Sequence, residues 1–266
     1  MTFRISFVLS AAILAACHRG SSSTTSSGPS PSPSASAPML NASTALTPAP
    51  NTLTEAEKKA GWKLLFDGKT TAGWRGYKMQ TMPPEWMVMD GTLMKMQHAE
   101  DIVTTRAYTN FELSIDWKLT LGSNSGIFIR GTEEYERVYW SAIEYQLAED
   151  SLTPDSKNPL TAVAAVYGFY PTKRGVNHRA GEWNTTKIVA NGSHVEHWLN
   201  GVLIASYDAW SPEFTAKYEA SKFHRYFVDK KITPENFAKA KTGLIAIQGD
   251  HPGELSLRNI KIRELK

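Results

Sequence analysis

The sequence predicts an all-β domain built as a two-sheet sandwich with a short helical insertion. Three observations support this fold class. Phe111–Leu119 alternates apolar and polar residues without a break, as a strand between a core and solvent does. Asp-Gly and Asn-Gly pairs, which favour tight turns, recur between similar stretches. Helix signals are few and fall in one segment.

The first 17 residues are expected to form an export signal. Arg4 supplies a positive charge, and the apolar run Ile5–Ala16 is too short to span a bilayer. Leu14-Ala15-Ala16-Cys17 resembles the bacterial lipobox, where cleavage precedes a lipidated cysteine. An ordinary signal peptide that contains a cysteine is the alternative. We expect an exported protein anchored through Cys17 at the outer membrane or periplasmic face, and His18 in place of an aspartate favours the outer membrane.

Residues 18–52 are predicted to form a disordered linker, and residues 53–266 a single domain. Gly20–Thr52 is mostly Ser, Thr, Pro and Ala without an acidic residue, so it buries too little apolar surface to offset the entropy of ordering. An ordered N-terminal strand is the alternative. With only one cysteine, no disulfide is expected. A net charge of +3 without a basic block does not suggest nucleic acid.

Many segments of the domain have strand-like patterns. The strongest hairpin signal is Asn200-Gly201, a two-residue loop between two apolar segments. So many short strands favour a sandwich over alternating strands and helices. The other predicted strands are Lys63–Phe66, Trp86–Met89, Thr92–Met96, Ile102–Thr104, Gly126–Arg130, Ile143–Leu147, Ala162–Tyr167, Thr186–Ala190, Val195–Leu199, Val202–Tyr207, Gly243–Gln248 and Leu255–Arg263.

Helix starts are expected at Ser211-Pro212-Glu213 and Thr233-Pro234-Glu235. Each triplet offers a capping hydroxyl, a proline at the first helical position and an acid in the first turn. The second triplet precedes Asn236–Ala240. Both fall within residues 209–241, so we expect a helical insertion between two strands.

Short blocks of characteristic residues run from about Trp62 to Leu265. They are Gly61–Lys69, Gly73-Trp74, Asn110–Leu113, Asn124–Arg130, Ile143–Leu147, Gly181–Asn184, His197–Gly201, Ser221–Phe223 and Arg258–Ile262. In this order and spacing they resemble the bacterial 3-keto-disaccharide hydrolase domain family, formerly a domain of unknown function. The resemblance implies a concanavalin A-like jelly roll.

The resemblance also implies an enzyme that cleaves glycosides bearing a 3-keto sugar. A ketone at C3 acidifies the hydrogen on C2, so a base can remove that proton and the glycosidic oxygen can leave from C1. Addition of water then gives net hydrolysis, and stopping earlier gives a lyase. Both courses need a base, a cation or donor at the enolate oxygen and an acid for the leaving group. No dinucleotide fingerprint is present, so no nucleotide cofactor is expected.

Glu144 and Gln146 are two positions apart on a predicted strand, so their side chains leave the same face. A binding face explains two such polar residues, and a solvated outer face is the alternative. We expect Arg130 to hold an oxyanion or sugar hydroxyl groups through its planar guanidinium group, and so to stabilise the enolate, with a salt bridge to Glu144 as the alternative.

His251 lies in a Gly- and Pro-flanked loop after a predicted strand, where functional residues often occur. We expect Glu144 or His251 to be the base, with an ordinary turn histidine as the alternative. No compact zinc motif is present, so any metal would be held by oxygen atoms and scattered histidines. One divalent metal ion held by Glu144, Gln146 and His251 is therefore a further hypothesis. In Gln248-Gly249-Asp250-His251 a glycine is added to the family's usual Gln-Asp-His-Gly pattern.

Four further residues are predicted to bind the glycan: Tyr145, Trp183, Asn184 and Gln248. Aromatic rings suit this role because they stack on a pyranose face, although most tryptophans of a sandwich belong to its core. The rival function is a surface carbohydrate-binding module that uses the same face without chemistry. Fold alone does not separate the two, because jelly rolls host both lectins and hydrolases.

Overall fold

The computed structural model describes residues 48–230 and 237–266, and these residues belong to one compact unit. The expected export signal, Cys17 and the linker up to residue 47 lie outside the described residues. Within the described part, no helix is both long and apolar enough to cross a membrane.

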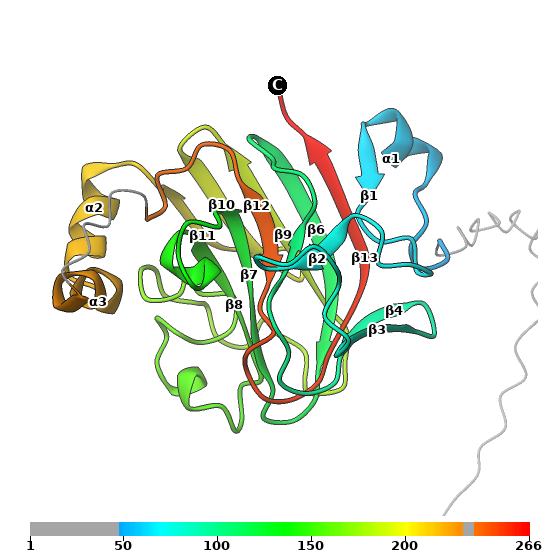
Figure 1. Cartoon of the computed structure of the whole chain (residues 1–266), viewed down its shortest axis with the longest axis horizontal. Coiled ribbons are helices and arrows are strands. Elements are labelled where there is room, and N and C mark those ends of the chain that lie inside the picture. Colours follow the sequence, from blue (N-terminus) through cyan, green and yellow to red (C-terminus); the bar gives the residue numbers. More distant parts are fainter. Residues whose placement is uncertain (1–47, 231–236) are drawn as a thin grey trace, which may run out of the picture. The chain divides into compact units, whose positions relative to one another are not determined.

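Two antiparallel sheets form the body of this unit (Figure 1). The larger sheet has the order β11-β10-β9-β6-β13-β4-β3, with β1 also paired to β13, and the smaller has the order β2-β5-β12-β7-β8. The strands of the larger sheet are β1 (Trp62–Leu64), β3 (Trp86–Met89), β4 (Thr92–Lys95), β6 (Phe111–Leu119), β9 (Asn184–Asn191), β10 (His194–Leu199), β11 (Val202–Asp208) and β13 (Leu255–Glu264). Those of the smaller sheet are β2 (Trp74–Gly76), β5 (Ile102–Thr104), β7 (Asn124–Gly131), β8 (Ile143–Ala148) and β12 (Leu244–Ile247).

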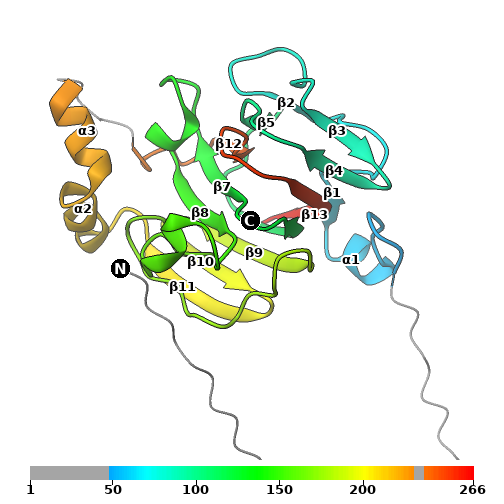
Figure 2. The same cartoon turned by 90° about the horizontal axis from the view of Figure 1, so that it is seen from below.

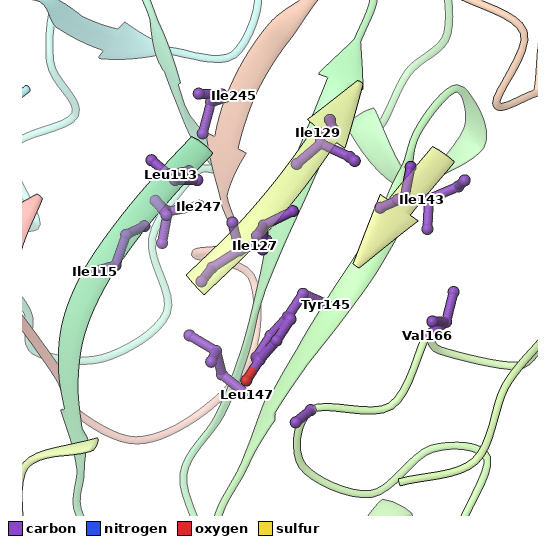
Figure 3. Close-up of a cluster of buried hydrophobic side chains, with 14 of the residues drawn as sticks. Leu113, Ile115, Ile127, Ile129, Ile143, Tyr145, Leu147, Val166, Ile245 and Ile247 are labelled. Atoms are coloured by element: carbon purple, nitrogen blue, oxygen red, sulfur yellow. The ribbon is translucent and has the colours of Figure 1, made fainter. Parts of the chain in front are cut away.

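The core lies between the sheets. On β6 the residues alternate buried and half-buried along the whole strand, as its sequence predicts. Alternate residues of β7, β8 and β12 point at the same core, and Figure 3 shows them packed against Leu113 and Ile115 of β6. The two-sheet sandwich is therefore confirmed, and burial of these side chains is its main source of stability.

The helical insertion is also confirmed. Helix α2 (Pro212–Glu219) begins where the sequence places it, because the Ser211 hydroxyl accepts a hydrogen bond from the amide of Phe214. Helix α3 (Lys222–Lys230) follows after two residues and lies beside α2 at one side of the sandwich (Figure 2). The predicted start at Thr233 lies outside the described residues, and residues 237–239 form a turn.

The structure differs from the predictions in three places. Residues 162–167 form no regular strand, because Ala164 has a positive φ of 64° and only Val166 makes isolated bridges. Strand β2 and helix α1 (Glu55–Lys59) were not predicted. The predicted linker extends to residue 52, but Asn51 already belongs to the folded domain, because it exchanges hydrogen bonds with Asn259 of β13 at 2.6 and 2.8 Å.

Candidate active site

A cavity of about 430 Å³ opens on the face of the smaller sheet that points away from the core. Strand β8 contributes Glu144 and Gln146, and Gln248 follows directly after β12. Helix α3 and a short 3₁₀ helix (Val138–Trp140) form the facing wall. The lining residues are Tyr139, Trp140, Glu144, Gln146, Asp155, Tyr167, Lys222, Phe223, Tyr226, Gln248, Asp250 and His251.

Strand alternation explains why Glu144 and Gln146 reach this cavity together. Ile143, Tyr145 and Leu147 point into the sandwich core, so the residues between them must face the other side. The neighbouring strand makes room for the carboxyl group at Gly126, where a Cβ would lie 2.9 Å from Glu144 Cδ and nearer still to Oε1. Glu144 therefore lies across the backbone of β7.

The Glu144 carboxyl group is buried, with the whole residue only 7% exposed. Burial raises its pKa to about 8, although the nearby Lys222 ammonium acts in the opposite direction. Among the described residues, no hydrogen bond to this carboxyl group is found. A buried, protonatable carboxyl group that borders a cavity is suited to proton transfer.

Lys222 enters the cavity from the first turn of α3. Its Nζ donates to the Tyr167 hydroxyl at 2.9 Å, and that hydroxyl donates to Asp155 Oδ1 at 3.3 Å. Nζ also lies 4.3 Å from the centre of the Tyr167 ring. These contacts direct one ammonium group towards the same space that Glu144 borders.

The loop after β12 brings Gln248, Asp250 and His251 to the opposite wall. It is held from behind by Lys95, which is fully buried and whose Nζ donates to the carbonyl of His251 at 2.6 Å. The amide of Gly249 donates to Asp101 Oδ1 at 2.8 Å. Burial lowers the pKa of His251, so its imidazole is neutral at neutral pH.

Three acceptor oxygens in the cavity wall are buried and have no hydrogen-bond partner in the described part of the chain. They are Gln146 Oε1, Gln248 Oε1 and Asp250 Oδ1. Buried polar atoms are normally satisfied, so unpaired acceptors around one cavity indicate a ligand that brings donors. The orientation of Gln146 is fixed, because its Nε2 donates to the carbonyl of Thr161 at 3.0 Å.

The metal hypothesis finds little support in the donor set. In residues 48–230 and 237–266, no three side chains of the types His, Cys, Asp and Glu come close enough together to hold a metal ion. Glu144, Gln146 and His251 do border one cavity, but only two of them belong to these types. A metal site stays a prediction, and no chemical step below passes through it.

Arg130 lies outside the cavity, which corrects its expected role at the enolate oxygen. The pairing of β12 with β7 shifts register beside it, and its φ of 55° breaks the strand alternation on which the prediction depended. Its guanidinium group donates to the carbonyls of Thr109 and Gly192 at 2.8 Å each. Arg130 therefore joins two loops of the larger sheet, and no ion pair links it to Glu144.

Three of the predicted glycan-binding residues also lie elsewhere. Tyr145 points into the core in Figure 3, and its hydroxyl donates to the carbonyl of Trp198 at 3.1 Å. The Trp183 ring lies 4.0 Å from the guanidinium carbon of Arg258, on β13 of the larger sheet. Asn184 is buried and borders a separate cavity, and its Oδ1 accepts from the amide of His178 at 2.8 Å.

The sequence did not single out Lys222 or Asp155. Lys222 stands in the Ser221–Phe223 block but was given no role, because nothing in a helical segment shows which strand it will face. Asp155 lies in a short 3₁₀ helix (Pro154–Lys157) without any periodic pattern. Only the folded chain brings these two residues to Glu144.

Residues 61–263 match the family model of the 3-keto-alpha-glucoside-1,2-lyase-like domain. A 3-keto-disaccharide hydrolase of Bacteroides thetaiotaomicron is 30% identical over 229 residues, which cover 77% of this chain and 79% of that protein. Two solved structures of candidate glycosyl hydrolases from Parabacteroides distasonis are each 28% identical. The first has a TM-score of 0.74 and covers 82% of this chain and 100% of that one. The second has a TM-score of 0.59 and covers 77% and 99%. These likenesses support a glycoside hydrolase-like function.

Proposed function

The chain belongs to the 3-keto-alpha-glucoside-1,2-lyase-like domain family, and we propose that it cleaves glycosides whose sugar carries a ketone at C3. One observation carries the proposal: a buried carboxyl group, a neutral imidazole and an ammonium group border the same cavity, on Glu144, His251 and Lys222. Those are the three kinds of group that elimination next to a ketone requires.

In the first step a base takes the proton from C2. The electron pair of the broken C–H bond forms a C1–C2 double bond as the bond from C1 to the glycosidic oxygen breaks, directly or through an enolate at the C3 oxygen. The departing oxygen takes up a proton and leaves as an alcohol. Water that later adds to the double bond gives the 3-keto sugar, and the sum is hydrolysis; release before that addition is a lyase outcome.

His251 and Glu144 divide the proton transfers between them. His251 has a lowered pKa and is unprotonated at neutral pH, so its imidazole can accept the C2 proton. Glu144 has a raised pKa and keeps its proton there, so it can donate to the leaving oxygen. Two titratable groups whose surroundings move their pKa values apart are a common basis for such a division.

Lys222 takes the role at the enolate oxygen that was predicted for Arg130. Its ammonium group can accept the negative charge that develops at the C3 oxygen, while Tyr167 and Asp155 hold it in place. The unpaired oxygens of Gln146, Gln248 and Asp250 offer acceptors for sugar hydroxyl groups. Tyr139, Trp140 and Tyr226 add the aromatic surface on which a pyranose ring packs.

The test uses purified protein with a 3-keto disaccharide and the unmodified disaccharide, each with and without a chelator. We expect free sugar only from the keto substrate. Glu144→Gln keeps the size of the side chain but cannot donate an acidic proton, so kcat should fall about 100-fold or more. Ser114→Ala, on the solvent side of the larger sheet, is the matched control and should leave kcat unchanged.

Binding of both disaccharides without release of sugar would replace the proposal by a carbohydrate-binding module. Full activity of Glu144→Gln would remove the acid role from that residue. Loss of activity with chelator, restored by a divalent ion, would support the metal hypothesis.

We further propose that the chain is exported and anchored to a membrane through lipidated Cys17, since residues 1–17 have the pattern of a lipoprotein signal. Several acyl chains suffice for this, because each buried methylene contributes about 0.8 kcal/mol. Such an anchor places a sugar-processing domain where glycans enter the cell envelope.

A further inference from the structure

A second cavity, of about 370 Å³, adjoins the active-site cavity. The two share Asp250, which borders both. The remaining walls come from the segments before β3 and after β4 and from the residue before the 3₁₀ helix Val138–Trp140. They are Glu85, His98, Ala99, Glu100 and Arg137.

Hydrogen bonds at Gly249 hold the wall between the two cavities in place. The amide of Ala99 donates to the carbonyl of Gly249 at 3.0 Å, and Gly249 in turn donates to the buried Asp101. A Cβ on Gly249 would come within 2.8 Å of the carbonyl carbon of Glu100 and closer to its oxygen. The two segments are therefore in direct backbone contact, which fixes the position of Asp250 between the cavities.

The second cavity differs from the first in chemistry. Its described lining contains no Phe, Tyr or Trp side chain, whereas the active-site cavity has five, Tyr139, Trp140, Tyr167, Phe223 and Tyr226. Arg137 Nη1 donates to Glu100 Oε2 at 3.1 Å, so this pair presents both donors and acceptors at the rim. Glu85 and His98 add further hydrogen-bonding groups. Such a surface is rich in the donors and acceptors that bind hydroxyl groups and lacks the large apolar rings of the active-site cavity.

We propose that this second cavity is the leaving-group subsite, and that it accepts a hydroxylated sugar rather than an aromatic aglycone. The inference rests on the proposed function, which places C1 and C2 of the keto sugar between His251 and Glu144. In this arrangement the group attached to C1 extends past Asp250, the residue that borders both cavities. Beside Asp250 and His251 this leaving group contacts the carboxylate, guanidinium and imidazole groups of the second cavity.

The experiment compares two substrates with the same 3-keto sugar and the same configuration at C1, one with a second sugar and one with a phenyl group as leaving group. Arg137→Gln removes the charge of the rim pair. The control is Arg106→Gln, since Arg106 forms an exposed ion pair with Glu264 at 2.6 Å and borders neither cavity. We expect Arg137→Gln to lower the ratio of kcat/KM for the disaccharide over the phenyl glycoside about tenfold, mainly through KM. The control should leave this ratio unchanged.

An equal effect of Arg137→Gln on both substrates would overturn the subsite, even if both are cleaved well. A general loss of stability would not imitate the expected result, because it acts on both substrates alike. If the wild-type chain cleaves neither substrate, the proposed function fails, and calorimetric binding of the disaccharide then decides on the cavity. If Arg137→Gln binds the disaccharide tenfold more weakly than the wild type, the second cavity remains a sugar site. If the variant and the wild type bind it equally, the inference is overturned.

Discussion

Glu144 reaches the cavity only because residue 126 has no side chain. A Cβ there would collide with the Glu144 carboxyl group. We therefore expect Gly126→Ala to displace the carboxyl group and to lower kcat between about 10- and 100-fold, since small misplacements of reacting groups are costly. Steady-state kinetics on the 3-keto disaccharide measures this loss.

The control for Gly126→Ala is the unfolding midpoint in urea. The alanine adds one methyl group in a sheet, so the chain should still unfold cooperatively. A variant with the wild-type kcat would show that the carboxyl group does not need its present position.

His197 gives the fold a pH dependence of its own. It is buried, its Nε2 lies 3.3 Å from the Tyr207 hydroxyl, and burial lowers its pKa to about 3. The unfolded chain protonates histidine near pH 6.5, so the folded state loses stability as the pH falls below that value. By pH 5 the loss from this one group should be about 2 kcal/mol.

Urea unfolding at pH 7 and pH 5 measures this effect. In His197→Gln the part of the pH dependence that is due to this residue should disappear, whatever the variant does to stability at pH 7. The exposed His194 provides the comparison, because His194→Gln should keep the wild-type difference between the two pH values. The explanation is refuted if His197→Gln keeps that difference as well.

Alternation alone was enough to predict that Glu144 and Gln146 share a face, and the same rule places Tyr145 in the core, against its predicted role in binding. The rule failed at Arg130. An extra residue in one strand of a pair reverses the side on which the following side chains point. The residue types in Asn124–Gly131 do not indicate that β7 contains such an irregularity. Positions on regular strands were thus predictable, and positions at irregularities were not.

The loop after β12 depends on an element far away in sequence. Lys95, the last residue of β4, has its ammonium group buried against the carbonyls of Gly249 and His251. Lys95→Met should leave the His251 carbonyl without this donor, while the Gly249 carbonyl keeps its hydrogen bond from Ala99. The loop should loosen at His251, so we expect kcat to fall about tenfold while the sheet stays folded.

Lys63→Met is the matched control for this loop, because Lys63 is exposed and its nearest carboxylate oxygen is 3.9 Å away. Kinetics and thermal unfolding of both variants separate a loosened loop from a damaged fold. Unchanged kinetics of Lys95→Met would mean that the loop holds its position without the lysine.

Regular elements were recovered from the sequence because their patterns are local. The Asn-Gly turn between β10 and β11 and the cap of α2 lie where their residues predict them. The route of residues 162–167 was not recoverable, because their hydrogen bonds go to the backbone of β8 and such pairing depends on the rest of the fold. The role of Lys222 was not predictable for the same reason, because its hydrogen-bond partner Tyr167 lies 55 residues away in the sequence.

At the scale of the whole chain, the proposed lipid anchor and the proposed chemistry should be separable. Cys17→Ser in the full chain should abolish incorporation of labelled palmitate and shift the protein from the membrane to the soluble fraction. Its kcat/KM on the 3-keto disaccharide should equal that of the wild type. Labelling of the Cys17→Ser chain would contradict the anchor, since Cys17 is the only cysteine.

The reciprocal hydrogen bonds between Asn51 and Asn259 also fix where the start of the described chain joins the sandwich. Asn259 donates to Asp116 of β6 as well, so this junction lies on the solvent side of the larger sheet. The candidate active-site cavity opens on the smaller sheet, in the other layer of the sandwich. If the proposed anchor and the proposed substrate are right, the point of attachment at residue 51 and the cavity that receives the sugar belong to different layers of the sandwich.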